Sequence, residues 1–166
     1  MTSEYEFKVI VVGDEQVGKT SLIIRYTEDR FSESYLQTLG SDFALKTVHQ
    51  DDKDITLVLW DIGGEEKFKI LHKYYFQGAQ VAILVYSITD SVSFESLPQW
   101  YNSVLEHVGK IPMILLGNKK DLDKLRTVDE NEGRHFAKNK GMPFFETSAK
   151  TADNVEDAFL TISKLL

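Results

Sequence analysis

The stretch GDEQVGKT, from Gly13 to Thr20, decides the fold of this chain. It follows FKVIVV (residues 7–12), a β-branched block that predicts a buried strand, and it precedes SLIIRY, where apolar residues recur at helical spacing. A strand, a loop of the form G-x-x-x-x-G-K-[ST] and a helix together indicate a phosphate-binding loop. Its glycines let backbone N–H groups point inward, and the helix N-terminus adds partial positive charge. We expect Lys19 to contact the β- and γ-phosphates of a nucleotide and the Thr20 hydroxyl to bind Mg²⁺.

Composition sets broad limits on the class of protein. The chain has 166 residues, of which 42% are hydrophobic and 27% charged, as expected for one globular domain over residues 1–166. A net charge of −7 argues against a nucleic-acid binder, which would show a basic face. The absence of cysteine excludes disulfides, thiolate metal sites and a lipid anchor on cysteine within this chain. Without an apolar signal region or a run of about 18 apolar residues, we expect a soluble, cytoplasmic protein.

The remaining pattern alternates strands and helices. Strands are predicted at 43–50 and 55–61, which form a hairpin, at 79–87, in IPMILLG and in MPFFE. Helices are predicted at 69–78, at 93–108, between a cap at Thr127 or Asp129 and Gly141, and at 154–166, whose buried face would carry Val155, Ala158, Phe159, Ile162 and Leu165. This order predicts an α/β fold with a six-stranded, mostly parallel sheet, one antiparallel strand from the hairpin, and helices on both faces.

In such sheets ligands bind at the carboxyl ends of the strands, where the polar loops of this chain converge. Asp61 ends one strand and suits a Mg²⁺ site, and the following Gly63 and Gly64 can bring backbone N–H groups close to a γ-phosphate. The long polar loop 28–43 contains Thr38, a second Mg²⁺ ligand if the loop folds over the nucleotide. Its aromatic residues Phe31 and Tyr35 are suited to stack on base or phosphate.

The loop NKKD, Asn118 to Asp121, indicates recognition of a base. An ionised carboxylate only accepts hydrogen bonds, so Asp121 can take the two adjacent N–H donors that guanine presents and adenine does not. Asn118 can both donate and accept, and the Lys119 stem can lie along the base plane. SAK, Ser148 to Lys150, adds backbone donors for the base carbonyl oxygen.

Five segments resemble, in their order and spacing, the five loops of a Ras-superfamily small GTPase, a P-loop NTPase: GDEQVGKT, TLGSDF, WDIGGEE, GNKKD and ETSAK. The chain resembles that family over essentially its whole length. YLQTLGSDF and YYFQGAQVAILVYSITDSVSFE are most similar to the Rab branch. The resemblance implies that GTP or GDP is bound with Mg²⁺, that Thr20, Thr38 and Asp61 hold the metal, that Lys19 and Gly64 contact the reacting phosphate, and that Glu65 occupies the water-orienting position. The nucleotide would be held by Gly13, Glu15, Gln16, Val17, Gly18, Lys19, Thr20, Ser21, Phe31, Tyr35, Thr38, Gly64, Asn118, Lys119, Asp121, Ser148, Ala149 and Lys150.

The resemblance also implies a switch, in which the γ-phosphate and Mg²⁺ order two loops and hydrolysis releases them. Effectors would read residues 31–45 and 62–77 of a monomer, with exchange factors and GTPase-activating proteins as further partner classes. Rab proteins usually end in a tail with prenylated cysteines, whereas this chain stops at Leu166, so either a tail was trimmed or the protein is not lipid-anchored.

Three residue differences from the family bear on catalysis. Glu15 stands where a small residue is usual, Glu65 stands where the family has glutamine, and DIGG replaces D-T-A-G, as in the Arf branch. Two functions therefore remain open: a guanine-nucleotide switch with slow GTP hydrolysis, or a scaffold that holds GTP and turns it over negligibly. An ATP-dependent enzyme shares the phosphate loop but does not explain NKKD and SAK.

Overall fold

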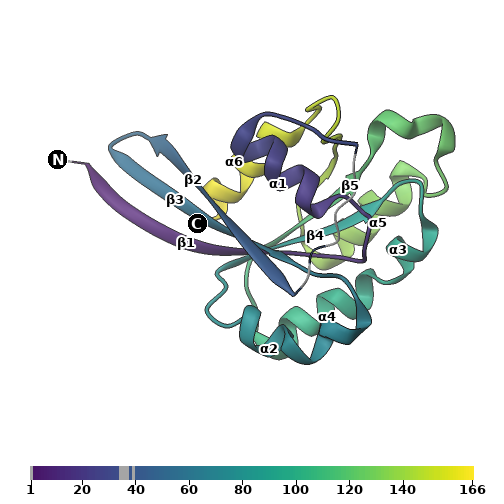
Figure 1. Cartoon of the computed structure of the whole chain (residues 1–166), viewed down its shortest axis with the longest axis horizontal. Helices are drawn as coiled ribbons and strands as arrows, with labels where there is room; N and C mark the ends of the chain where they lie inside the picture. The colour runs from purple at the N-terminus through teal and green to yellow at the C-terminus, as the bar shows by residue number, and fades with distance from the viewer. Residues whose placement is uncertain (1, 34–37, 39) are drawn as a thin grey trace.

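The computed structural model describes residues 2–33, 38 and 40–166. Its centre is a six-stranded sheet with the strand order β2-β3-β1-β4-β5-β6 (Figure 1). The strands are β1 (Ser3–Val12), β2 (Ser41–Gln50), β3 (Lys53–Ile62), β4 (Val81–Ser87), β5 (Met113–Asn118) and β6 (Phe144–Glu146). Only β2 runs antiparallel to its neighbour, because it forms a hairpin with β3. The predicted fold class and the single antiparallel strand are both confirmed.

Helices cover both faces of the sheet because the central strands are apolar on both sides. Along β1, Val9 and Val11 pack into one core and Ile10 and Val12 into the other. The first core is covered by α1 (Lys19–Glu28) and α6 (Val155–Leu165), which meet where the rings of Tyr26 and Phe159 stack. The second core is covered by α2 (His72–Tyr75), α3 (Ser91–Glu95), α4 (Leu97–His107) and α5 (Glu130–Lys140), on the opposite side of the sheet in Figure 1.

The predictions of one helix over 93–108 and of a fully buried face on the last helix need correction. The expected helix 93–108 is two helices, α3 and α4, which meet at Ser96. The side chain of Asp90 caps α3 by accepting from the backbone N–H groups of Val92 and Ser93, and Pro98 lies in the first turn of α4, where its missing N–H costs nothing. Leu165 is 37% exposed at the last turn of α6, although the other four residues predicted for that face are buried.

Other boundaries differ where polar loops form short helical turns. The expected helix 69–78 is a 3₁₀ turn, η1 (Glu66–Leu71), followed by the single-turn α2. The polar stretch after β5 contains a second 3₁₀ turn, η2 (Lys120–Leu125). For α5 the cap is Asp129, whose side chain and that of Glu132 bond each other's backbone N–H groups, and Gly141 ends the helix as predicted.

Candidate functional site

The phosphate-binding loop leaves the end of β1 and enters α1, as the sequence predicted. Gly18 has φ +98°, and a Cβ there would lie 2.2 Å from Asn118 Nδ2, so a side chain is excluded both by backbone conformation and by contact. Lys19 is only 6% exposed, and its Nζ donates to the carbonyl oxygens of Gly13 (2.8 Å) and Asp14 (2.7 Å). Burial lowers the pKa of Lys19 to about 8, against the opposing effect of nearby carboxylates, Asp61 foremost. The loop therefore holds a cation in a largely dehydrated position.

Thr20, Thr38 and Asp61 come together beside this loop, although they belong to three distant segments. The Thr20 and Thr38 hydroxyls lie 2.8 Å apart, and both donate to Oδ2 of Asp61, Thr38 at 3.1 Å. Asp61 is 4% exposed, and its other oxygen, Oδ1, is buried without a hydrogen-bond partner among the described residues. Burial raises the pKa of Asp61, with hydrogen bonds from the two threonines and the charge of Lys19 opposing the shift. Two hydroxyls and a carboxylate with an unpartnered oxygen are the hard oxygen ligands that suit Mg²⁺.

No group of three or more His, Asp or Glu residues suited to a metal occurs in the part of the chain that the structure describes.

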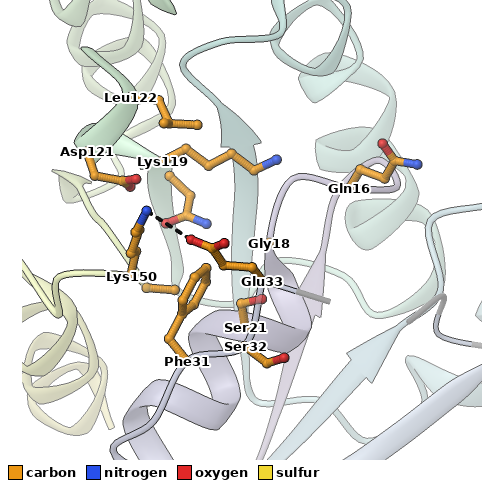
Figure 2. A pocket seen from close by; sticks show the side chains of 12 residues that line it. Gln16, Gly18, Ser21, Phe31, Ser32, Glu33, Lys119, Asp121, Leu122 and Lys150 are labelled. Carbon is orange, nitrogen blue, oxygen red and sulfur yellow. Dashed lines mark ion pairs between the residues drawn. The ribbon is translucent and has the colours of Figure 1, made fainter. Parts of the chain in front are cut away.

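A pocket of about 310 Å³ opens next to the phosphate-binding loop (Figure 2). Ser21 on α1 and Asn118 at the end of β5 line it, together with residues from the loops after β1, β5 and β6 and from the segment after α1. The latter are Gln16, Gly18, Phe31, Ser32, Glu33, Lys119, Asp121, Leu122, Ala149 and Lys150. The structure thus brings Gln16, Gly18 and Ser21 of the predicted phosphate-binding residues to the same pocket as most of the predicted base residues. Tyr35 lies outside the described residues, so its predicted contact stays a prediction.

Hydrogen bonds between the loops hold the residues that line this pocket in position. Asn118 is 2% exposed; its Nδ2 donates to the Val17 carbonyl (2.9 Å), and its Oδ1 accepts from Thr147 Oγ1 (3.1 Å). Ser148 Oγ donates to Asp121 Oδ1 (2.8 Å), which orients the carboxylate that we expect to read the base. The pocket is therefore held in shape by the same side chains that the sequence assigned to recognition.

Two arginine side chains that no sequence motif indicated support the loop that contains Ser148, Ala149 and Lys150. Arg25, on α1, donates from Nε to the Ala149 carbonyl (2.8 Å) and from a terminal nitrogen to the Lys150 carbonyl (2.9 Å). Arg126, after η2, forms a two-point ion pair with the buried Glu146 at 2.7 and 2.8 Å. Such planar two-point pairs fix orientation as well as distance. Neither arginine lies in a recognisable motif, so only the fold reveals these contacts.

Glu33 and Lys150 form an ion pair at 3.0 Å between two sides of the pocket (dashed in Figure 2). This contact raises the pKa of Lys150. Since both side chains are at least half exposed, the pair contributes little to stability, but it connects the segment after α1 with the SAK loop.

The segment after β3 lies directly against the phosphate-binding loop. Gly63 N–H donates to the Gly40 carbonyl at 2.7 Å, and a Cβ on Gly64 would lie 2.5 Å from the carbonyl oxygen of Gly13. The next residue is Glu65, whose side chain is 17% exposed and whose Oε2 lies 2.9 Å from Lys67 Nζ. Of the residues predicted to contact the reacting phosphate, Gly64 thus lies against the phosphate-binding loop, and Glu65 follows it in the chain.

On the far side of this segment lies a cavity of about 540 Å³ that the sequence did not suggest. Trp100, on α4, donates from its indole N–H to Asp14 Oδ1 at 2.8 Å, and its ring lies 5.2 Å from that of His72. Burial lowers the pKa of His72 to about 4, helped by the charges of His107 and Lys69. These contacts connect α4 and α2 with the phosphate-binding loop.

No helix within the described residues is long and apolar enough to cross a membrane.

Comparison with known proteins agrees with this geometry. A family model described as Ras family matches residues 8–166. The Ras-related protein RIC1 of Oryza sativa subsp. japonica is 42% identical over 161 residues, which cover 96% of this chain and 80% of that protein. The Ras-related protein RABD2a of Arabidopsis thaliana is 41% identical over 96% of this chain and 79% of its own length, and the Ras-related protein Rab-13 of Canis lupus familiaris is 42% identical over 97% and 80%. A phosphate-binding loop, a base pocket and these relatives lead to one conclusion: the chain belongs to the Ras family of GTP-binding small GTPases and is most similar to its Rab-like branch.

Proposed function

We propose that this protein is a guanine-nucleotide switch of the Rab-like, membrane-traffic kind, with one G domain over residues 1–166 and slow, Mg²⁺-dependent GTP hydrolysis. The observation that carries the proposal is the pocket in which Asp121, oriented by Ser148, lies within reach of the phosphate-binding loop. A carboxylate held in this way accepts two adjacent N–H donors, which selects guanine over adenine. The backbone of residues 148–150 would supply donors to the base carbonyl oxygen.

Mg²⁺ would be held by Thr20, Thr38 and Asp61, and the unpartnered Oδ1 of Asp61 supports this assignment. The metal neutralises charge that develops on the phosphates. Thr38 belongs to the loop that the sequence left undetermined, and here it reaches both other residues. A loop that contributes a ligand only when the terminal phosphate is present is the physical basis of a nucleotide-dependent switch.

Exposed apolar side chains support an effector surface on residues 31–45 and 62–77. Phe43 and Leu45 on β2 are each 58% exposed, and Ile70 and Tyr74 are 74% and 61% exposed. Large apolar residues gathered on an otherwise polar surface mark interaction sites. These residues flank the two segments next to the nucleotide, so a partner bound there would respond to the nucleotide state. The switch would act as a monomer in the cytoplasm.

Slow hydrolysis is proposed because of Glu65 and Glu15. A glutamine can accept a hydrogen bond from water and donate one to phosphate oxygens, whereas an ionised glutamate can only accept. Glu15 adds a second negative charge on the phosphate-binding loop, where an arginine from an activating protein would have to enter. Both residues therefore work against stabilisation of the charge that develops during phosphoryl transfer.

The test has two steps. Nucleotide released from the purified protein should be GDP or GTP, and recovery of adenine nucleotides alone would refute the base assignment. Single-turnover hydrolysis of bound GTP then separates the two remaining functions. Slow but measurable conversion that depends on Mg²⁺ supports the switch, while retention of intact GTP over many hours supports a scaffold.

A further inference from the structure

The conformation of the segment after β3 places Gly64, the residue before Glu65, against the phosphate-binding loop. Gly63 donates to the Gly40 carbonyl (2.7 Å), and a Cβ there would lie 2.7 Å from the Thr38 carbonyl oxygen. A Cβ on Gly64 would lie 2.5 Å from the carbonyl oxygen of Gly13. Because both residues before Glu65 are enclosed by other loops, the backbone that carries Glu65 is held beside the phosphate-binding loop.

Glu65 has a cation beside it. Its Oε2 lies 2.9 Å from Nζ of Lys67, an ion-pair distance at which the two groups are not aligned as a hydrogen bond. The Lys67 ammonium also lies 5.2 Å from the centre of the Phe68 ring. The Glu65 side chain is 17% exposed and that of Lys67 is 65% exposed, so the acid is largely shielded from water while its partner is not.

A second pair on the same turn provides a comparison. Lys69 Nζ lies 2.7 Å from Oε2 of Glu66, whose side chain is 83% exposed. That pair lies out in solvent, where screening by water and salt makes ion pairs weak. Lys67 and Lys69 therefore lie on the same turn but pair with different acids, Lys67 with the shielded Glu65 and Lys69 with the exposed Glu66.

GTP carries one more negatively charged phosphate than GDP, and this phosphate would lie at the corner formed by Lys19, Thr38 and Gly64. An unpaired carboxylate at Glu65 would repel it, and such repulsion is strong where water is partly excluded. We propose that Lys67 is a specificity-determining residue that neutralises Glu65, and that this allows the site to accept a triphosphate as well as a diphosphate. The inference rests on the proposed function, because it concerns the same nucleotide site.

The experiment is a double-mutant cycle on nucleotide selectivity. GTP and GDP affinities are measured in Mg²⁺ by competition with a fluorescent guanine nucleotide, for the parent protein, Lys67→Met, Lys67→Arg, Lys69→Met, Glu65→Gln and the double variant Glu65→Gln with Lys67→Met. The ratio of the two affinities is compared, since partial unfolding lowers both affinities equally and leaves their ratio unchanged.

Lys67→Met should lower the GTP-to-GDP affinity ratio by about fivefold, the upper end for a partly exposed ion pair. Lys67→Arg should keep the parent ratio, and Lys69→Met should leave it unchanged. With Glu65→Gln present, Lys67→Met should have no further effect, since no charge remains to neutralise.

An unchanged ratio in Lys67→Met overturns the inference, as does an equal loss in Lys69→Met. A loss that persists in the double variant also overturns it, because Lys67 would then act on the phosphate directly rather than through Glu65. Failure of the parent protein to bind guanine nucleotides would instead refute the proposed function, so the two failures are distinguishable.

Discussion

Replacement of Gly64 by alanine tests whether its backbone N–H contacts the terminal phosphate. A Cβ at Gly64 would lie 2.5 Å from the carbonyl oxygen of Gly13 and 2.6 Å from Asp14 C and Glu15 N. The shortest of these contacts is 0.9 Å below the 3.4 Å at which ordinary van der Waals contact begins. All three atoms belong to the backbone, so no side-chain rotation relieves the overlap, and the segment after β3 must move away from the phosphate-binding loop.

This displacement removes a donor from the γ-phosphate. A hydrogen bond to a charged group contributes about 1.5–3 kcal/mol, so GTP affinity should fall by about 10- to 150-fold. GDP lacks the γ-phosphate and loses no such hydrogen bond, so its affinity should fall much less than that of GTP.

The assay is isothermal titration of nucleotide-free protein with GTP or GDP in Mg²⁺. The matched control is Gly109→Ala: Gly109 has φ +98° but has no atom within 4 Å of its would-be Cβ, so alanine there strains the backbone far from the site. That variant should lose stability and keep the parent selectivity between GTP and GDP. Equal loss of GTP and GDP affinity in Gly64→Ala, or no loss at all, would refute the assignment of Gly64.

Three further predictions concern the base, the metal and acid stability. Asp121→Asn should weaken guanine-nucleotide binding and favour xanthine nucleotides, because an amide can donate to the xanthine carbonyl; competition binding that shows unchanged GTP affinity would contradict this. Thr20→Asn should remove most of the difference between GDP affinities measured with Mg²⁺ and with a chelator, while the melting temperature with saturating GDP changes little. His72 has a pKa of about 4 in the folded protein, against about 6.5 in the unfolded chain, so the unfolded chain takes up a proton first as the pH falls. Stability should therefore decrease between pH 6.5 and pH 4, by up to about 2 kcal/mol at pH 5, and urea unfolding of His72→Phe should lack this loss.

The phosphate-binding loop illustrates how much local sequence can determine. The role predicted for Gly13 to Thr20 depends on backbone N–H groups, glycine conformations and a helix N-terminus, all of which are set within a few residues. The same holds for α5, where Asp129 and Glu132 cap the helix and Gly141 ends it. Continuous apolar runs likewise predicted the buried strands β4 and β5, whose residues are all buried.

The sequence was less informative where one contact decides between similar local structures. The helix predicted over 93–108 breaks at Ser96 because Pro98 has no backbone N–H to continue the hydrogen bonds of α3 and is tolerated only in the first turn of a new helix, α4. Leu165 fits the apolar face of α6 in pattern, but it remains 37% exposed in the last turn of that helix. Periodicity shows which residues share a face, whereas burial depends on what the fold places opposite that face.

By itself, the sequence determined the class of the fold and predicted the phosphate-binding loop and the base and metal residues, because each is encoded in short motifs and in the alternation of strands and helices. Only the tertiary structure decided that Thr38 reaches Thr20 and Asp61, that Arg25 and Arg126 support the loops of the base pocket, and that Lys67 pairs with Glu65. The contacts of Thr38, Arg25 and Arg126 join segments that are far apart in the chain. The Lys67–Glu65 pair depends on the path of the backbone, which Gly63 and Gly64 fix by packing against other loops. Motifs record the chemistry of single loops, whereas the distances between loops arise from packing on a common sheet, and no local pattern carries that information.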